Sequence, residues 1–252
     1  MQLYLTTTPE EYSQAAGQGY RLAHLAYQIG EDGRLHRSAG ARQAQNGLLS
    51  MNGPGAGHIT DTTGLCRDIL RECVSHGYEG VCADFGAAVQ PDRAAFLEEL
   101  SGLLHRSGKR LFVSAAYGSR VTDAFVLINT DLSGGTLSTM LSDACHAFGT
   151  QRVAMDIERV QMDFLLPSPT GEGTPLRRTE FEHLQTSLRP SVFFSDELCA
   201  KYFTYRQDGK SHFVLFDDAD TIRCKLKLAR RMELRYVFLL CSEVSDLLSQ
   251  LR

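Results

Sequence analysis

The chain has 252 residues, of which 43% are hydrophobic and 22% are charged, an ordinary composition for a globular protein with a sizeable core. Its formal net charge of −4 and its pI of about 6.1 argue against binding to nucleic acid or to an anionic membrane surface. No apolar run approaches membrane-spanning length, and the first residues lack the basic region and apolar core of a signal peptide. We therefore expect a cytoplasmic protein with no nucleic-acid or membrane partner.

Seven cysteines are scattered along the chain without a C-x-x-C pair. Several of them, such as Cys82 and Cys241, lie in apolar runs, which indicates buried, reduced thiols in a reducing compartment. A zinc site would need clustered Cys and His, and the sequence has no such cluster. We expect no metal and no cofactor, and the oligomeric state stays open.

Short apolar strands alternate with helical patterns along most of the chain. Strands are expected at residues 3–5, 22–29, 47–51, 80–85, 110–116, 152–157 or 160–165, 191–194 or 202–205, 212–216 and 235–240. Helical periodicity covers residues 63–76, 93–107, 137–148, 178–188 and 221–232. Asp61 and Pro91 mark helix starts, Asp220 with Thr221 is a further candidate cap, and Gly77 and Gly108 mark helix ends.

This alternation predicts a parallel sheet covered by helices, and a count close to eight strands favours a closed barrel. Continuous apolar runs such as Tyr236–Leu240 fit strands that are covered on both faces. We predict the α/β class and a single (β/α)8 TIM-type barrel, not necessarily regular, with residues 1–252 as one domain. The stretch Pro167–Pro175 is interpreted as a surface loop. Gly53–Gly57 lacks the Lys and Ser/Thr of a phosphate-binding P-loop and is interpreted as a loop at the barrel mouth.

The stretch Gly80–Gly86 resembles the fourth-strand signature of family 18 glycoside hydrolases, the chitinase family. That family's pattern is Asp-Gly-x-Asp-x-Asp-x-Glu, and its last Glu is the catalytic acid. In this chain Cys82 takes the place of the first inner Asp, Asp84 keeps the second, and Gly86 stands at the acid position. The resemblance therefore implies a barrel whose proton donor is missing.

Other segments resemble the same family in the same order along the chain. They are Leu22–Ile29 for the second strand, Leu48–Gly53 for the third, Arg110–Tyr117 for the fifth, and Val160–Phe164 at the place of the family's Met-x-Tyr-Asp. Phe213–Asp218 with Lys225 is similar to the sporulation-associated branch, which degrades or binds cortex peptidoglycan, and implies a bacterial protein. The chain has no Trp, whereas the family closes its site with one at the end of the last strand; Leu239 or Leu240 takes that place.

The chemistry of the resemblance centres on Asp84. In such barrels the reactive groups stand at the carboxyl ends of the strands, and a substrate-assisted glycosidase needs only one protein acid. The resemblance implies that Asp84 orients the substrate's acetamido group, while Gly86 has no side chain that could donate a proton. Because loss of a well-placed acid commonly costs about 10²–10⁴-fold in rate, weak residual hydrolysis is conceivable. The alternative for Asp84 is a buried carboxylate satisfied by backbone donors.

Further candidates complete the predicted site. Asp156, Glu158 and Asp163 lie in or near the expected sixth strand, and Glu243 follows the last strand. Tyr117 and Tyr202 are candidate aromatic platforms for a sugar ring, although packing in the core is the alternative for each. For the four carboxylates the alternative is a solvated or ion-paired position on the rim.

Three hypotheses about function follow. The first is a catalytically impaired or inactive barrel that binds a glycan or related ligand at its mouth, in which Gly86→Glu should create or raise activity if the rest of the mouth is intact. The second is an active hydrolase of N-acetylglucosamine-containing glycans, such as chitin or peptidoglycan fragments, that uses Asp84 with Asp156, Glu158 or Asp163. The third is a barrel of unrelated, non-carbohydrate function, since a fold alone does not fix a function.

Overall fold

A computed structural model describes residues 1–39, 41, 44–52, 58–131, 135–169 and 171–251. The loop expected at residues 53–57 lies outside the described residues. Within the described part of the chain, no helix is both long and apolar enough to cross a membrane.

Eight parallel strands of the described chain close into a barrel in the order β1-β14-β8-β7-β6-β5-β4-β2, with β1 pairing again with β2. This closed barrel confirms the predicted TIM-type architecture. A short antiparallel strand, β3 (Leu35–Arg37), extends from β2 and is not part of the barrel wall. The barrel strands are β1 (Gln2–Thr7), β2 (Arg21–Ile29), β4 (Leu48–Asn52), β5 (Gly80–Asp84), β6 (Arg110–Ser114), β7 (Phe125–Asn129), β8 (Val153–Ile157) and β14 (Tyr236–Leu240).

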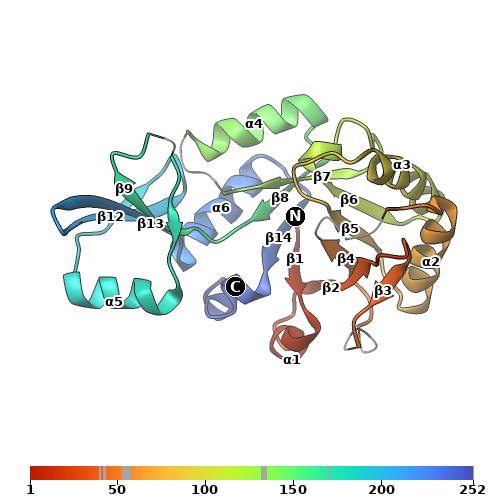
Figure 1. Cartoon of the computed structure of the whole chain (residues 1–252), viewed down its shortest axis with the longest axis horizontal. Helices are drawn as coiled ribbons and strands as arrows, with labels where there is room; N and C mark the ends of the chain where they lie inside the picture. The colour runs from red at the N-terminus through yellow and green to blue at the C-terminus, as the bar shows by residue number, and fades with distance from the viewer. Residues whose placement is uncertain (40, 42–43, 53–57, 132–134, 170, 252) are drawn as a thin grey trace.

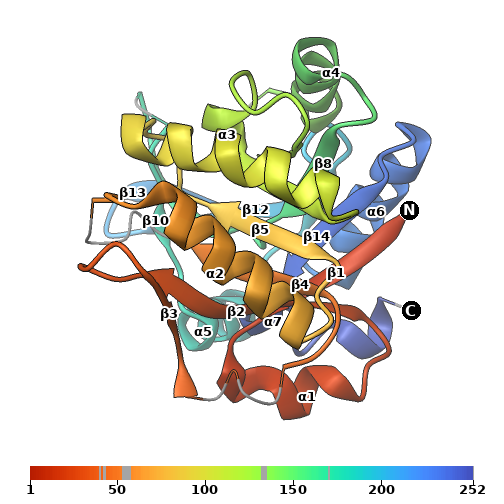
Figure 2. The same ribbon diagram turned by 90° about the vertical axis from the view of Figure 1, so that its right-hand side faces the viewer.

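Helices cover the outside of this wall (Figures 1 and 2). They are α1 (Tyr12–Ala16), α2 (Thr62–Ser75), α3 (Pro91–Arg106), α4 (Leu137–Phe148), α6 (Ala219–Arg231) and α7 (Cys241–Val244). The sequence places the four long ones correctly. Asp61 caps α2 by accepting a hydrogen bond from the Gly64 N–H, and Pro91 begins α3. Helix α6 is capped by Asp218 rather than by Asp220 or Thr221.

Alternation along each strand sorts the core into an inner and two outer parts. Inward side chains fill the barrel with a largely aromatic cluster: Tyr4, Ala23, Leu48, Cys82, Phe112, Leu127, Ala154, Tyr236 and Phe238. Outward side chains of β2, β4, β5 and β6 pack against α2 and α3, and those of β1, β7, β8 and β14 pack against α4, α6 and α7. The described interior of the barrel is therefore a packed core, and a cavity opens above it at the carboxyl ends of the strands.

One barrel strand, β7, is absent from the predicted set. A 3-10 turn at Ala115–Tyr117 and a short loop connect β6 to β7. The Arg152 guanidinium braces this connection by donating to the backbone carbonyls of Ala124, Gly118 and Val121 at 2.8–2.9 Å. A contact from a distant residue thus holds a segment that lacks any periodic pattern of its own.

A second, antiparallel sheet is inserted between β8 and α6 and stands beside the barrel (Figure 1). Its order is β10-β9-β13-β12-β11, and helix α5 (Arg178–Leu188) packs on one of its faces through Phe181. The strands are β9 (Gln161–Leu166), β10 (Thr174–Pro175), β11 (Phe193–Ser195), β12 (Ala200–Gln207) and β13 (Lys210–Phe216). The expected strands at 160–165, 191–194, 202–205 and 212–216 therefore exist, but none of them is a barrel strand.

A buried ion pair joins the two ends of this insertion to the barrel. The Lys225 ammonium of α6 donates to an Asp217 carboxylate oxygen at 2.6 Å, and both side chains are buried. The same carboxylate oxygen accepts the Val160 N–H at 2.9 Å, and the Asp217 N–H donates to the Val160 carbonyl at 2.8 Å. The segments that lead into and out of the insertion are therefore held together where Val160, Asp217 and Lys225 meet.

Candidate functional site

The barrel mouth is built by one further layer of inward side chains. Each member lies two residues beyond a member of the aromatic inner cluster, so that it points to the same side of its strand but one step closer to the carboxyl end. This layer contains Thr6, Leu25, Ser50, Asp84, Ser114, Asn129, Asp156 and Leu240. The strand alternation thus brings two carboxylates and several neutral polar groups onto a floor of apolar rings.

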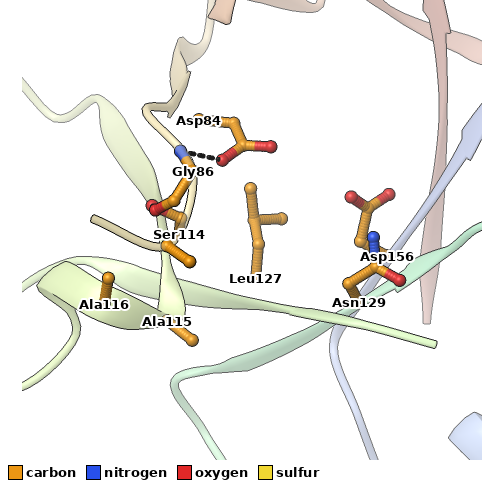
Figure 3. Close-up of a pocket in the computed structure, with 9 residues that line it drawn as sticks. Asp84, Gly86, Ser114, Ala115, Ala116, Leu127, Asn129 and Asp156 are labelled. Carbon is orange, nitrogen blue, oxygen red and sulfur yellow. Dashed lines mark hydrogen bonds between the residues drawn. The ribbon is translucent and has the colours of Figure 1, made fainter. Parts of the chain in front are cut away.

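The layer opens into a cavity with two connected parts. The larger part, of about 430 Å³, is lined by Asp84, Gly86, Ala87, Ser114, Ala115, Ala116, Leu127, Asn129 and Asp156. A smaller part of about 150 Å³ shares Asp84, Leu127 and Asp156 and reaches the inner cluster at Cys82 and Phe238. Figure 3 shows Asp84 and Asp156 projecting into the same space.

Asp84 and Gly86 form a tight turn at the end of β5. One carboxylate oxygen of Asp84 accepts the Gly86 N–H at 3.0 Å, as Figure 3 shows. Gly86 has φ +75°, in the left-handed region that favours glycine, and a Cβ placed there would meet no heavy atom within 4 Å. The position two residues beyond Asp84 therefore lines the cavity and leaves it open.

Asp156 is the second carboxylate of the cavity and comes from β8. It is partly buried, and no hydrogen bond from another described residue reaches its carboxyl group. Burial, followed by repulsion from the charges of Asp84, Glu158 and Glu243, raises the pKa of Asp156 to about 7. The group is thus poised between its charged and neutral forms near neutral pH.

Glu158 and Glu243 stand on the rim rather than in the cavity. The Asn129 amide donates to a Glu158 carboxylate oxygen at 2.6 Å, which orients Asn129 within the cavity wall. A Glu243 carboxylate oxygen accepts the Arg159 N–H at 2.9 Å, while burial raises the pKa of Glu243. Both acids shape the field at the mouth, and neither lines the cavity.

Tyr117 is fully buried and does not face the cavity. Its hydroxyl donates to the Ala88 carbonyl at 3.2 Å and accepts the Gln90 N–H at 3.1 Å. Its ring packs edge-on against Phe85. Tyr117 therefore braces the loop that carries Gly86, and it offers no face to a sugar ring.

Asp163 and Tyr202 lie in the second sheet, apart from the cavity lining. Asp163 accepts hydrogen bonds from Tyr205 at 2.8 Å and from a His212 ring nitrogen at 2.9 Å. Tyr202 is stacked against Phe193 and Phe213. The expected sixth-strand position of Asp156, Glu158 and Asp163 is wrong, because the sixth barrel strand is β7. Asp156 lies near the end of the seventh strand, β8, and the other two residues follow that strand.

Sequence reasoning missed most of the uncharged lining residues. Asn129 lies on β7, a strand that the sequence does not predict, and Ser114 lacks the conspicuous chemistry of a carboxylate. The alternation rule that places Asp84 two residues after Cys82 would also have placed Ser114 after Phe112. The same rule shows which leucine of the last strand stands at the place of the family's Trp. Leu240 lines the smaller part of the cavity, whereas Leu239 points outward and is buried between the barrel wall and the helices.

The arrangement can accept hydrogen bonds, donate a few, and cover an apolar surface. Among the described residues that line the cavity there is no Lys or Arg. In the part of the chain that the structure describes, no group of three or more His, Cys, Asp or Glu side chains is placed to hold a metal ion. The chemistry available at the mouth is therefore that of two carboxylates, one of which has a pKa near neutrality.

The fold is a TIM-type barrel similar to those of family 18 chitinases. Comparison with protein-family models gives no match, and comparison with curated proteins gives none either. Solved structures, however, match over nearly the whole chain at 12–17% sequence identity, which shows a common fold.

Three of these structures illustrate the likeness. The spore cortex-lytic enzyme SleL of Bacillus megaterium QM B1551 matches with a TM-score of 0.70 and 15% identity, over 99% of this chain and 73% of that one. The chitinase of Chromobacterium violaceum ATCC 12472 matches with a TM-score of 0.72 and 16% identity, over 99% and 97%. A class V chitinase mutant of Cycas revoluta, in complex with (GlcNAc)3, matches with a TM-score of 0.70 and 12% identity, over 100% and 98%.

Proposed function

We propose that this protein binds a glycan at the barrel mouth and hydrolyses it poorly or not at all. The observation that carries the proposal is the cavity itself: Asp84 and Asp156 line it, while the position two residues beyond Asp84 is Gly86, with open space where a side chain would stand. Structures with the same fold include chitinases in complex with (GlcNAc)3 and (GlcNAc)4. We therefore favour an N-acetylglucosamine-containing glycan as the ligand.

The size and lining of the cavity support binding of a sugar unit. A volume of about 430 Å³ falls within the range of ordinary small-molecule sites, about 300–1,000 Å³. The Ser114 hydroxyl already donates to the Gly86 carbonyl at 3.0 Å and can accept a hydrogen bond from a ligand. The Asn129 amide and the two carboxylates offer further polar contacts to hydroxyl or acetamido groups. Leu127 and three alanines of the lining, Ala87, Ala115 and Ala116, offer the apolar surface against which a pyranose ring can lie.

Poor hydrolysis follows from the same geometry. A glycosidic oxygen must receive a proton as its bond breaks, and Gly86 has no group that could donate one. The Asp84 carboxylate already accepts a backbone hydrogen bond from Gly86, which holds it in its turn. An Asp held in this way is suited to accept hydrogen bonds from a ligand rather than to protonate a leaving group.

A second candidate function, glycan hydrolysis with a relocated acid, rests on Asp156. A general acid works best when its pKa lies near the working pH, and the pKa of Asp156 is raised to about 7 within the same cavity. In this mechanism the substrate's acetamido group would act as the nucleophile, oriented by Asp84, while Asp156 protonates the leaving oxygen. Turnover would then fall as Asp156 loses its proton above neutral pH.

Calorimetric titration with chitin-derived and peptidoglycan-derived oligosaccharides, together with a product assay on the same samples, tests both functions. Under the first proposal the native protein binds at least one oligosaccharide without turnover, and Asp84→Asn or Asn129→Ala weakens binding. Asp163→Asn serves as the control, because this carboxylate lies in the second sheet and its loss should leave affinity unchanged.

The possible results separate the candidates. Turnover by the native protein that Asp156→Asn abolishes would establish the second candidate and overturn the first. No binding to any of these oligosaccharides would contradict both and would favour a barrel with a non-carbohydrate function.

We also propose that residues 1–252 work as one domain, in which the second sheet is an appendage of the barrel, and that the protein is cytoplasmic.

A further inference from the structure

Two cysteines meet at the junction between the second sheet and the barrel. Cys199 directly precedes β12, and Cys224 lies in α6, 25 residues later. Their sulfur atoms are 2.7 Å apart. Carbon atoms in van der Waals contact are about 3.5–4.0 Å apart, and sulfur is larger than carbon, so these thiols are closer than non-bonded contact allows. A disulfide bond, by comparison, is about 2.0 Å long.

The two cysteines are held in this position by the elements that carry them. Cys199 is buried among the residues that α6 packs against the barrel, and its backbone is in the left-handed region with φ +48°. The α-helix fixes the direction of the Cys224 side chain, which is only partly buried and packs against the same cluster. Two residues after Cys199, Lys201 of β12 forms ion pairs with Asp218 and Asp220 at the start of α6. A disulfide bond between the two sulfur atoms would therefore need little movement of the backbone.

We propose that Cys199 and Cys224 are a reversible disulfide site that, when oxidised, fastens the second sheet to helix α6 of the barrel. No other pair of cysteine sulfurs is in contact within the described part of the chain, so the bond is specific to this pair. The linkage goes beyond the glycan-binding function and does not depend on it. For this pair it revises the expectation of buried, reduced thiols.

The oxidant is a low-molecular-weight disulfide, such as glutathione disulfide, and the chemistry is two successive exchanges. The more exposed Cys224 thiol loses its proton, its thiolate attacks one sulfur of the small disulfide, and a thiolate leaves and takes up that proton. The Cys199 thiolate then attacks the Cys224 sulfur, and the second small thiolate leaves and is protonated in turn. Two protein thiols are oxidised by two electrons, and one small disulfide is reduced to two thiols.

The surroundings set the order and the speed of these exchanges. Burial, together with the neighbouring Cys224 sulfur, raises the pKa of the Cys199 thiol to about 12, which makes it the poorer first nucleophile. Contact with Cys224 compensates in the second exchange, because the attacking and attacked sulfurs are already adjacent. In a reducing cytoplasm the pair would be mainly reduced and would respond to oxidation, as cytosolic disulfides commonly do.

Thiol counting on the full-length protein tests the proposal directly. The protein is incubated with glutathione disulfide, unfolded, alkylated, and weighed by mass spectrometry before and after reduction. We expect five alkylated cysteines before reduction and seven after it, since two of the seven are in the bond. Peptide mapping should identify a Cys199–Cys224 cross-link. Seven alkylated cysteines, stable glutathione adducts in place of the bond, or a cross-link between other cysteines would overturn the proposal.

A stability measurement gives an independent check. Closing a loop of this length should raise the thermal midpoint of the oxidised native protein above that of the reduced protein by roughly 5–10 °C. Cys224→Ser should abolish this redox-dependent difference, and Cys199→Ala provides a second variant should the first fold poorly. Cys145→Ser is the matched control, because Cys145 is a half-buried helical cysteine with no sulfur partner in the described structure and its loss should leave the difference intact. An equal difference in all variants would contradict the assignment.

Discussion

Because the pKa of Asp156 is raised in the folded protein, we expect the free energy of unfolding to fall as the pH rises toward neutrality. The folded protein holds the Asp156 proton with a pKa of about 7, whereas the ordinary value for Asp is 3.8. The folded state therefore binds this proton more tightly than the unfolded state does. Below the unfolded pKa both states are protonated and Asp156 costs nothing. As the pH rises toward 7 the folded state loses stability, and above 7 the loss is constant.

Asp156→Asn removes this loss because an amide does not ionise. Relative to the native protein, the variant should gain stability as the pH rises from the unfolded to the folded pKa. The full difference between 3.8 and about 7 corresponds to about 4 kcal/mol, at about 1.4 kcal/mol for each pH unit. Between about pH 5 and about pH 8.5 some two pH units of this range are crossed, and water in the open cavity screens part of the charge, so we expect a gain of about 1.5–3 kcal/mol.

Urea unfolding of the native protein and of Asp156→Asn at both pH values measures this gain, with the m-value as a check that the unfolded states are alike. Titrating groups that do not interact with Asp156 contribute equally to both proteins and cancel in the difference. Asp143→Asn, at an exposed position on α4, controls for loss of one negative charge and should show no such pH dependence. Parallel stability curves for the native protein and Asp156→Asn would refute the argument and would remove the support for Asp156 as an acid.

Three further variants test what holds the structure around the site, each by urea unfolding near neutral pH. Lys225→Met leaves the buried Asp217 carboxylate unpaired and should cost about 3–5 kcal/mol, and pairing it with Asp217→Leu should recover much of this loss. Tyr117→Phe removes the hydroxyl that braces the loop after β5 and should cost about 1–3 kcal/mol, with the cavity rim loosened in hydrogen exchange. Phe203→Ala empties the fully buried centre of the second sheet and should cost about 3–5 kcal/mol while leaving the inner cluster of the barrel intact. A loss below 1 kcal/mol in any of the three would contradict the assigned contacts.

The barrel itself is predictable because its signals are local. Each strand between a helix end and the next helix start is a short apolar run, and the helix starts at Asp61 and Pro91 are visible in the sequence. Strand β7 cannot be predicted in this way, because the connection between β6 and β7 is a 3-10 turn and a loop instead of a long helix. Its course depends on Arg152, which lies beyond the strand in sequence and binds the carbonyls of the loop in space. No window of the sequence contains that interaction.

The second sheet was misassigned for a different reason. An apolar run specifies that a segment is a strand but not which strand it pairs with, so strands of the insertion were counted toward the barrel. One signal was available: Asp208-Gly209 joins β12 to β13, and both residues have positive φ, as a two-residue hairpin turn requires. That turn forces antiparallel neighbours, which a parallel barrel cannot contain.

For the site, the sequence identifies the residues whose chemistry is conspicuous and misses those defined only by position. Asp84 and Asp156 were expected at strand ends, and the structure places both in one cavity. The effect of the Asp84 charge on the pKa of Asp156 could not be predicted, because it depends on how β5 and β8 face each other across the barrel.

Gly86 differs from a catalytic Glu in its backbone as well as in its side chain. Its φ of +75° and its hydrogen bond to Asp84 belong to a turn, and a residue with a Cβ in that conformation costs about 1–2 kcal/mol. Because no heavy atom lies within 4 Å of the added Cβ, Gly86→Glu should fold with only this cost, which urea unfolding can measure. Its carboxyl group, however, would leave a left-handed turn rather than the end of an extended strand. Restored hydrolysis therefore requires the turn to relax and release Asp84, so a Glu at this position without that relaxation adds charge to the mouth but no aimed proton donor.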